Sequence, residues 1–157
     1  MNTVNSEKVR ERFRRREPAS IRRTVQYSHI VDGAREDVFP LICPAREADW
    51  LPGWDAHLIY SESELGEAGC VFRTEEDGRT GAGLWVFPHH VWPECVKIVR
   101  FSPPVLVQIN IVLEELEARR TRISWEYSLT GLSDEGNGKV REVGDSMYRL
   151  RAGHVPK

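Results

Sequence analysis

The sequence lacks any apolar run long enough to cross a membrane. A spanning helix needs about 20 consecutive apolar residues, whereas the 40% of this 157-residue chain that is hydrophobic is interrupted throughout by the 29% that is charged. The basic N-terminus is followed by no apolar segment, so a secretory signal peptide is not expected either. We therefore predict a protein without a membrane span, located in the cytoplasm.

Cysteine is scarce, and the common metal and catalytic motifs are absent. Cys43, Cys70 and Cys95 are odd in number and show no Cys-x-x-Cys spacing, which argues against a disulfide framework and against a zinc site. The sequence has no Gly-rich phosphate loop, Gly-x-Ser-x-Gly elbow or His-Glu-x-x-His pair. His89 and His90 are adjacent with a proline on either side, so we expect them in a loop, poorly placed to share an ion. No metal and no cofactor is predicted.

Positive charge is concentrated only at the N-terminus. Residues 1–23 hold eight Arg or Lys against three Glu, a charge of +5, so the rest of the chain carries −7. We assign residues 1–21 to a basic, partly helical leader and residues 22–157 to one domain. The basic cluster could contact nucleic acid or an acidic membrane, but Phe13 is its only aromatic residue, it contains no glycine, and the domain is acidic. A solvated leader is therefore favoured, and no nucleic-acid partner is predicted.

Alternation of apolar and polar residues is the main structural signal. In 22–31, the residues Val25, Tyr27, His29 and Val31 share one face, which is the pattern of a half-buried strand. The same period of two predicts later strands at 57–61, 69–74, 82–87, 95–101, 105–113 and 121–130.

Helical spacing is confined to three places. Two short helices are expected after the first strand, at 34–42 and 46–50, and the segment 131–138 reads as a loop. A terminal helix is predicted at 139–151, where apolar residues recur at helical spacing: Val140, Val143, Met147 and Leu150. Helices segregated from one antiparallel sheet give the fold class α+β, with a curved sheet of about seven strands.

Several short segments carry a resemblance to a known family. They fall within about residues 22–140 and are Val38-Phe39-Pro40-Leu41-Ile42-Cys43-Pro44, Arg46-Glu47, Trp50, Gly53-Trp54, Tyr60-Ser61-Glu62-Ser63, Cys70-Val71-Phe72-Arg73-Thr74, Leu84-Trp85-Val86 and Leu129-Thr130-Gly131-Leu132. With the order of elements, they resemble the START-like helix-grip superfamily, also called SRPBCC, which includes polyketide cyclase/dehydrase-like proteins. Within it, the chain is similar to a group of small bacterial proteins.

The resemblance implies a curved sheet wrapped around a C-terminal helix, with a cavity between them. Family members bind apolar or amphipathic small molecules there, and some catalyse cyclisation, dehydration or hydrolysis. The terminal helix predicted here is shortened, because about a dozen residues span under about 20 Å. The cavity could then be more open, filled by the N-terminal segment, or completed by a second subunit in a homodimer.

Candidate site residues gather in the Trp-rich stretch from Cys43 to Trp54. Arg46, Trp50 and Trp54 could contact a ligand at a pocket mouth, or the indoles could pack the short helices onto the sheet while Arg46 pairs with an acid. Glu47 is the candidate acid or base, because a carboxylate in an apolar pocket has a raised pKa.

Further candidates lie on the predicted strands. His29 could act as a base or contact a ligand, or it could be a hydrogen-bonded core histidine. Other residues could line a cavity or belong to the core: Tyr60, Trp85, Asn110, Trp125 and Tyr127. Three functions follow: a small-molecule binding protein, a cyclase/dehydratase-like enzyme using Glu47 or His29, or a protein–protein or dimerisation module.

Overall fold

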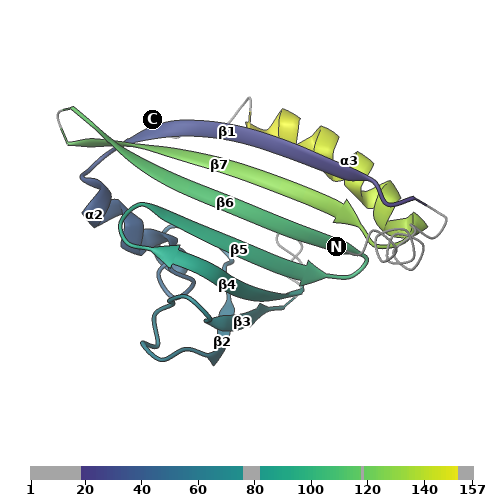
Figure 1. The fold of residues 1–157 in the computed structure, drawn as a ribbon, viewed down its shortest axis with the longest axis horizontal. Helices are drawn as coiled ribbons and strands as arrows, with labels where there is room; N and C mark the ends of the chain where they lie inside the picture. The colour runs from purple at the N-terminus through teal and green to yellow at the C-terminus, as the bar shows by residue number, and fades with distance from the viewer. Residues whose placement is uncertain (1–18, 76–81, 118, 152–157) are drawn as a thin grey trace, which may run out of the picture.

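The protein folds into one curved antiparallel sheet with helices on one side. The computed structural model describes residues 19–75, 82–117 and 119–151, with side chains in the last helix described up to Val143. The sheet has seven strands in the order β1-β7-β6-β5-β4-β3-β2. Figure 1 shows α3 alongside β1 and β7 and α2 at the opposite end of the strands. The predicted fold class is confirmed; the leader, apart from residues 19–21, lies outside the described residues.

The strands follow the alternation in the sequence closely. Their bounds are Arg22–Asp32 (β1), Ala56–Tyr60 (β2), Val71–Thr74 (β3), Gly83–Val91 (β4), Cys95–Ser102 (β5), Val105–Leu116 (β6) and Arg120–Gly131 (β7). Every neighbouring pair is antiparallel. An antiparallel sheet can have one solvent-exposed and one buried face, so polar and apolar residues alternate along each strand. This period of two is the pattern that predicted the strands.

The two faces of the sheet differ in burial. One face, which we call the inner face, carries the buried residues of the central strands and is covered at both ends by helices; its buried set includes Val25, Val107, Ile109, Ile111, Ile123 and Leu129. The opposite, outer face carries the alternate and mostly polar residues, such as Gln26, Asn110 and Glu126. The core therefore lies between the inner face and the helices.

The short helices cover the inner face at one end. α2 (Arg35–Val38) continues directly into the 3-10 helix η1 (Phe39–Ile42), and a second 3-10 turn, η2, spans Glu47–Asp49. The helix predicted at 34–42 is thus one α-helical turn followed by a tighter one, because Pro40 lacks the N–H that would continue the α pattern. Val38, Phe39 and Ile42 are buried in the core.

The terminal helix begins earlier than the sequence predicted. α3 spans Asp134–Arg151, so the expectation that 131–138 is entirely a loop is wrong from Asp134 onward. Ser133 caps the helix: its hydroxyl accepts from the Gly136 N–H at 3.2 Å, and its carbonyl accepts from the Asn137 N–H at 2.8 Å. The 18 residues span about 27 Å. Within the described residues, no helix combines the length and apolar character that a membrane crossing requires.

The segment around the paired histidines is also a strand. β4 continues through Pro88 to Val91, with an irregular register between Val86 and His89, so the predicted loop there is wrong. A register irregularity of this kind accommodates proline, because the backbone there does not donate a regular ladder hydrogen bond. Across the described ranges, no group of three or more His, Cys, Asp or Glu residues could hold a metal ion.

Asn137 fastens α3 to the start of β1. Its Oδ1 accepts from the Ile21 N–H at 2.9 Å, its Nδ2 donates to the Ala19 carbonyl at 3.1 Å, and the residue is 5% exposed. We expect Asn137→Ala to lower the free energy of unfolding by about 2 kcal/mol, because two hydrogen bonds are lost and a shielded N–H is left without its acceptor. Urea denaturation measures this. Asn110→Ala, which removes one bond on the outer face, is the control, and an equal loss in both variants would contradict the fastening role.

Candidate functional site

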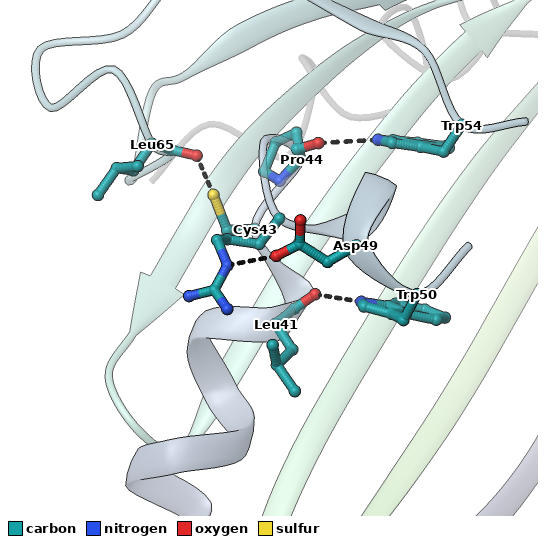
Figure 2. A network of polar contacts seen from close by, with 8 residues as sticks. Leu41, Cys43, Pro44, Asp49, Trp50, Trp54 and Leu65 are labelled. Atoms are coloured by element: carbon teal, nitrogen blue, oxygen red, sulfur yellow. Dashed lines mark hydrogen bonds and ion pairs between the residues drawn. The ribbon is translucent and has the colours of Figure 1, made fainter. Parts of the chain in front are cut away.

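The Trp-rich bend is held by its own indole groups. Figure 2 shows the Trp50 Nε1 donating to the Leu41 carbonyl at 2.7 Å and the Trp54 Nε1 donating to the Pro44 carbonyl at 2.8 Å. These carbonyls lie at the end of η1 and just after it, where helix geometry leaves acceptors without partners. Trp50 is 47% exposed, so nearly half of its surface gains nothing from packing. The described contacts of both indoles are structural.

Arg46 lies on the surface of the bend. Its Nε is 2.8 Å from Asp49 Oδ2, and both side chains are well exposed. An exposed ion pair of this kind contributes at most about 1 kcal/mol to stability. The structure therefore places Arg46 in a local pair with Asp49, an acid three residues away.

Glu47 differs from its neighbours in the bend. It is half-buried, and its carboxylate has no hydrogen-bond or ion-pair partner among the described residues. Burial raises the pKa of Glu47 from its ordinary 4.5 to about 8. A carboxyl group with this pKa is mostly protonated at neutral pH, so it can donate a proton as well as accept one.

Cys43, the buried cysteine of the bend, is not a candidate for proton transfer or nucleophilic chemistry. The Cys43 thiol donates to the Leu65 carbonyl, and burial raises its pKa (Figure 2). Burial raises the pKa of Cys70 as well. A raised pKa lowers the fraction of thiolate, which is the nucleophilic form, so both residues serve as small core residues.

Glu67 has the most strongly lowered pKa in the chain's described part, and its cause is local. The Ser63 hydroxyl, the Glu62 N–H at 2.8 Å and the Ser61 hydroxyl at 2.9 Å all donate to its carboxylate. These donors, the Ser63 hydroxyl first, lower the pKa to about 2. The carboxylate therefore organises the loop that contains Ser61, Glu62 and Ser63.

Trp54 and Trp85 belong to an aromatic cluster of the core. The Trp85 ring is 5.5 Å from Phe72 and 5.6 Å from Trp54, and its Nε1 donates to the Thr74 hydroxyl at 3.0 Å. The Arg100 guanidinium lies 5.0 Å above the same ring. Trp85 is buried with its polar atom satisfied, which favours the structural interpretation of this candidate.

Four further rings form a row on the inner face, which we call the ring row. It consists of His29 and Tyr27 from β1 and Trp125 and Tyr127 from β7. Tyr27 pairs directly with Trp125, with ring centroids 5.8 Å apart and planes within 4°. The other spacings in the row lie between 6.1 and 6.4 Å. The strand register thus brings together three of the sequence candidates.

The ring row is incompletely covered although it faces the core side. All four residues are half-buried, whereas Val25 and Leu129 on the same two strands are buried. The Trp125 Nε1 is shielded from solvent and has no hydrogen-bond partner among the described residues. A shielded donor without an acceptor costs free energy unless another molecule supplies the acceptor.

A hollow of about 590 Å³ is lined by residues of β1, β5, β6 and β7. Most of its lining side chains belong to the outer face, and they include Gln26, Ser28, Lys97, Asn110, Ser124 and Glu126. Glu126 accepts from the side-chain amides of Gln26 and, at 3.0 Å, of Asn110. Asn110, a candidate to line a cavity or belong to the core, lies on this outer face, because it alternates with the inward Ile109 and Ile111.

The sequence interpretation missed the outer-face partners of Asn110, although alternation along β1 and β7 was enough to place Gln26 and Glu126 on one face.

Tyr60 belongs neither to the ring row nor to the outer-face residues that line the hollow. It lies on the edge strand β2, is 56% exposed, and its hydroxyl donates to Glu62 at 3.2 Å.

Solved structures, rather than sequences, reveal what the chain is similar to. No family model and no curated protein sequence matches it. Norcoclaurine synthase from Thalictrum flavum, solved in complex with dopamine and hydroxybenzaldehyde, is 14% identical, with a TM-score of 0.58 over 88% of this chain and 91% of that one. Mll3558 from Rhizobium loti is 14% identical, with a TM-score of 0.60 over 81% and 92%. Ara h 8.0201 is 13% identical, with a TM-score of 0.57 over 82% and 94%.

The chain has the helix-grip fold. At these identities the likeness concerns the fold alone. The chemistry of this helix-grip protein has to be argued from its own residues: the ring row, the Trp125 N–H and the Glu47 carboxyl.

Proposed function

We propose that the protein binds a small molecule whose flat, apolar part lies against the ring row on the inner face. The observation that carries this proposal is a set of four parallel, half-exposed rings in the part of the sheet that faces the core. Along β1 and β7 the ring row lies between Ile21, where α3 begins to pack, and Gly33, where α2 follows. Large apolar side chains left half-covered between two helices offer the kind of wall that ligand sites use.

The chemistry of the ring row narrows the ligand class. Stacked aromatic rings favour a further planar group at a centroid distance of about 4.5–7 Å. The Trp125 N–H has no acceptor in the part of the chain that the structure describes, which favours a ligand that also carries a hydrogen-bond acceptor, such as a carbonyl or phenol oxygen. The complex of norcoclaurine synthase with dopamine and hydroxybenzaldehyde supports an aromatic ligand on the same fold.

Removing the Trp125 N–H tests the proposal. We expect hydroxybenzaldehyde or a related aromatic carbonyl compound to raise the melting temperature of the wild-type chain. Trp125→Phe keeps a ring but loses the donor, so we expect roughly 3- to 10-fold weaker binding in isothermal titration calorimetry, the effect of one hydrogen bond.

Trp50→Phe is the matched control, because Trp50 also donates from Nε1 but lies on the surface of the bend. It should bind the probe as the wild-type chain does. Equal weakening in both variants, or no binding of any aromatic carbonyl probe to the wild-type chain, would contradict a ligand site at the ring row.

A second candidate function, an enzyme of the cyclase/dehydratase type, is favoured by Glu47. Its carboxyl is half-buried and has no partner among the described residues, and its pKa of about 8 suits a group that gives a proton to a bound molecule near neutral pH. His29 is part of the ring row, 6.4 Å from Trp125, and would contact the ligand through its ring in either function.

A further inference from the structure

The two edges of the sheet are built differently. β2 is short, has five residues, and pairs with β3 through an irregular register between Leu58 and Tyr60. β1 has eleven residues, pairs with β7 in an unbroken register, and contains neither proline nor glycine. Proteins commonly prevent an edge strand from pairing with another chain by shortening the strand or by a β-bulge, as in β2. β1 is neither short nor bulged.

The backbone of β1 presents one set of residues to the edge. Gly131 N–H donates to the Ile21 carbonyl at 2.9 Å, and Gly33 N–H donates to the Arg119 carbonyl at 2.8 Å. Hydrogen-bonded pairs recur at every second residue of an antiparallel ladder, so the odd-numbered residues of β1 bond to β7. The even-numbered residues therefore direct their N–H and C=O groups away from the sheet, where no other described strand pairs with them.

The charges of β1 are arranged for pairing with an identical strand. Its outer-face positions begin with Arg22 and end with Asp32, and both residues are exposed. When two copies of β1 run antiparallel with Tyr27 at the centre, Arg22 of each copy lies opposite Asp32 of the other. The pairs between them are uncharged: Thr24 with Ile30, and Gln26 with Ser28.

Other registers lose this match. A shift by two residues places Arg22 opposite Ile30 or beyond the end of the strand, and a parallel arrangement brings like charges together. Opposite charges across a strand pair stabilise it, and like charges directly opposite destabilise it. Only the Tyr27-centred antiparallel register places Arg22 and Asp32 of each copy opposite a residue of the other charge. The same register also pairs the even-numbered backbone groups of the two strands.

We propose that β1 is a self-association edge, at which a second copy of this chain adds its own β1 antiparallel around Tyr27. The contact is isologous, as expected for a two-fold dimer. On the inner face the two Tyr27 residues then form a pair that is not hydrogen-bonded, with Cα atoms about 4.5 Å apart. The ring rows of the two copies thereby meet, although the dimer itself does not depend on the proposed ligand.

Charge exchange tests the register. Sedimentation of the full chain at low salt should show a concentration-dependent dimer. Arg22→Asp and Asp32→Arg should each weaken association about tenfold, because each change affects two symmetric pairs. The double variant R22D/D32R should restore it. A wild-type chain that stays monomeric at high concentration, or a double variant no better than the single ones, would overturn the proposal.

Two further variants test the edge itself. Ser28→Pro removes an outward N–H and leaves the ladder with β7 intact, so we expect a folded monomer, while Ser28→Ala should still dimerise. Tyr27→Cys should form a disulfide between copies under mild oxidation, because the Cα separation is suitable. Ile30→Cys should not, because the two copies of residue 30 lie about 20 Å apart along the strand. A dimer that survives Ser28→Pro would place association elsewhere.

Discussion

Replacing Gly136 by alanine is expected to lower the free energy of unfolding by about 3 kcal/mol. A Cβ at this position would lie 2.1 Å from the Pro104 carbonyl oxygen, in the first turn of α3. That oxygen already accepts from the Leu132 N–H at 2.9 Å, so it is fixed by the turn that follows β7. Because the obstacle is backbone rather than a flexible side chain, the helix has to move, and overpacking of this kind costs about 1–3 kcal/mol or more.

Gly138 supplies a matched control in the same helix. A Cβ there meets nothing within 4 Å. Gly138→Ala should therefore stabilise the chain by about 0.5–1 kcal/mol through helix propensity alone. Urea denaturation of the two variants should give changes of opposite sign. Destabilisation by both would mean that the position of α3 on the sheet is not set by the close approach of Gly136 to Pro104.

This contact also explains why the start of α3 was not predicted from the sequence. Asp134-Glu135-Gly136-Asn137-Gly138 contains two glycines within three residues, which is typical of a loop. In the structure one glycine permits the close approach to Pro104, and Asn137 bonds the start of β1. Tertiary contacts of this kind override local propensity and have no period that a single sequence displays.

The strands and their faces were predictable because burial enforces a period of two. That alternation places His29, Trp125 and Tyr127 on the inner side, and the register of β1 with β7 then stacks their rings. The same reasoning, applied to Asn110, would have placed it on the outer face. The carbonyl partners of Trp50 and Trp54 could not be predicted, because the path of the bend between η1 and β2 follows no repeat.

The second large effect concerns Glu47 and pH. We expect the free energy of unfolding of the wild-type chain to fall as pH rises from about 4.5 to about 8, with Glu47 as a main contributor. In this range the folded chain keeps a proton on Glu47, whose pKa is about 8, whereas the unfolded chain has lost it near the ordinary value of 4.5. The folded state then binds more protons than the unfolded state, so stability decreases with increasing pH and levels off above pH 8.

Glu47→Gln isolates this contribution. Glutamine resembles the protonated carboxyl, so the variant and the wild-type chain should be equally stable at about pH 3.5, below both pKa values of Glu47. At pH 8.5 the variant should be more stable by about 2 kcal/mol, below the full value of the pKa shift because the side chain is only half-buried. Glu94→Gln, which removes a carboxylate at an exposed position, is the control for the loss of one negative charge. If Glu47→Gln is no more stable than the wild-type chain at pH 8.5, the carboxylate is adequately solvated, and the enzymatic candidate loses its proton donor. If the difference appears and the aromatic carbonyl probe still binds the variant, Glu47 is a half-buried acid that is protonated near neutral pH and is not needed for binding of the probe.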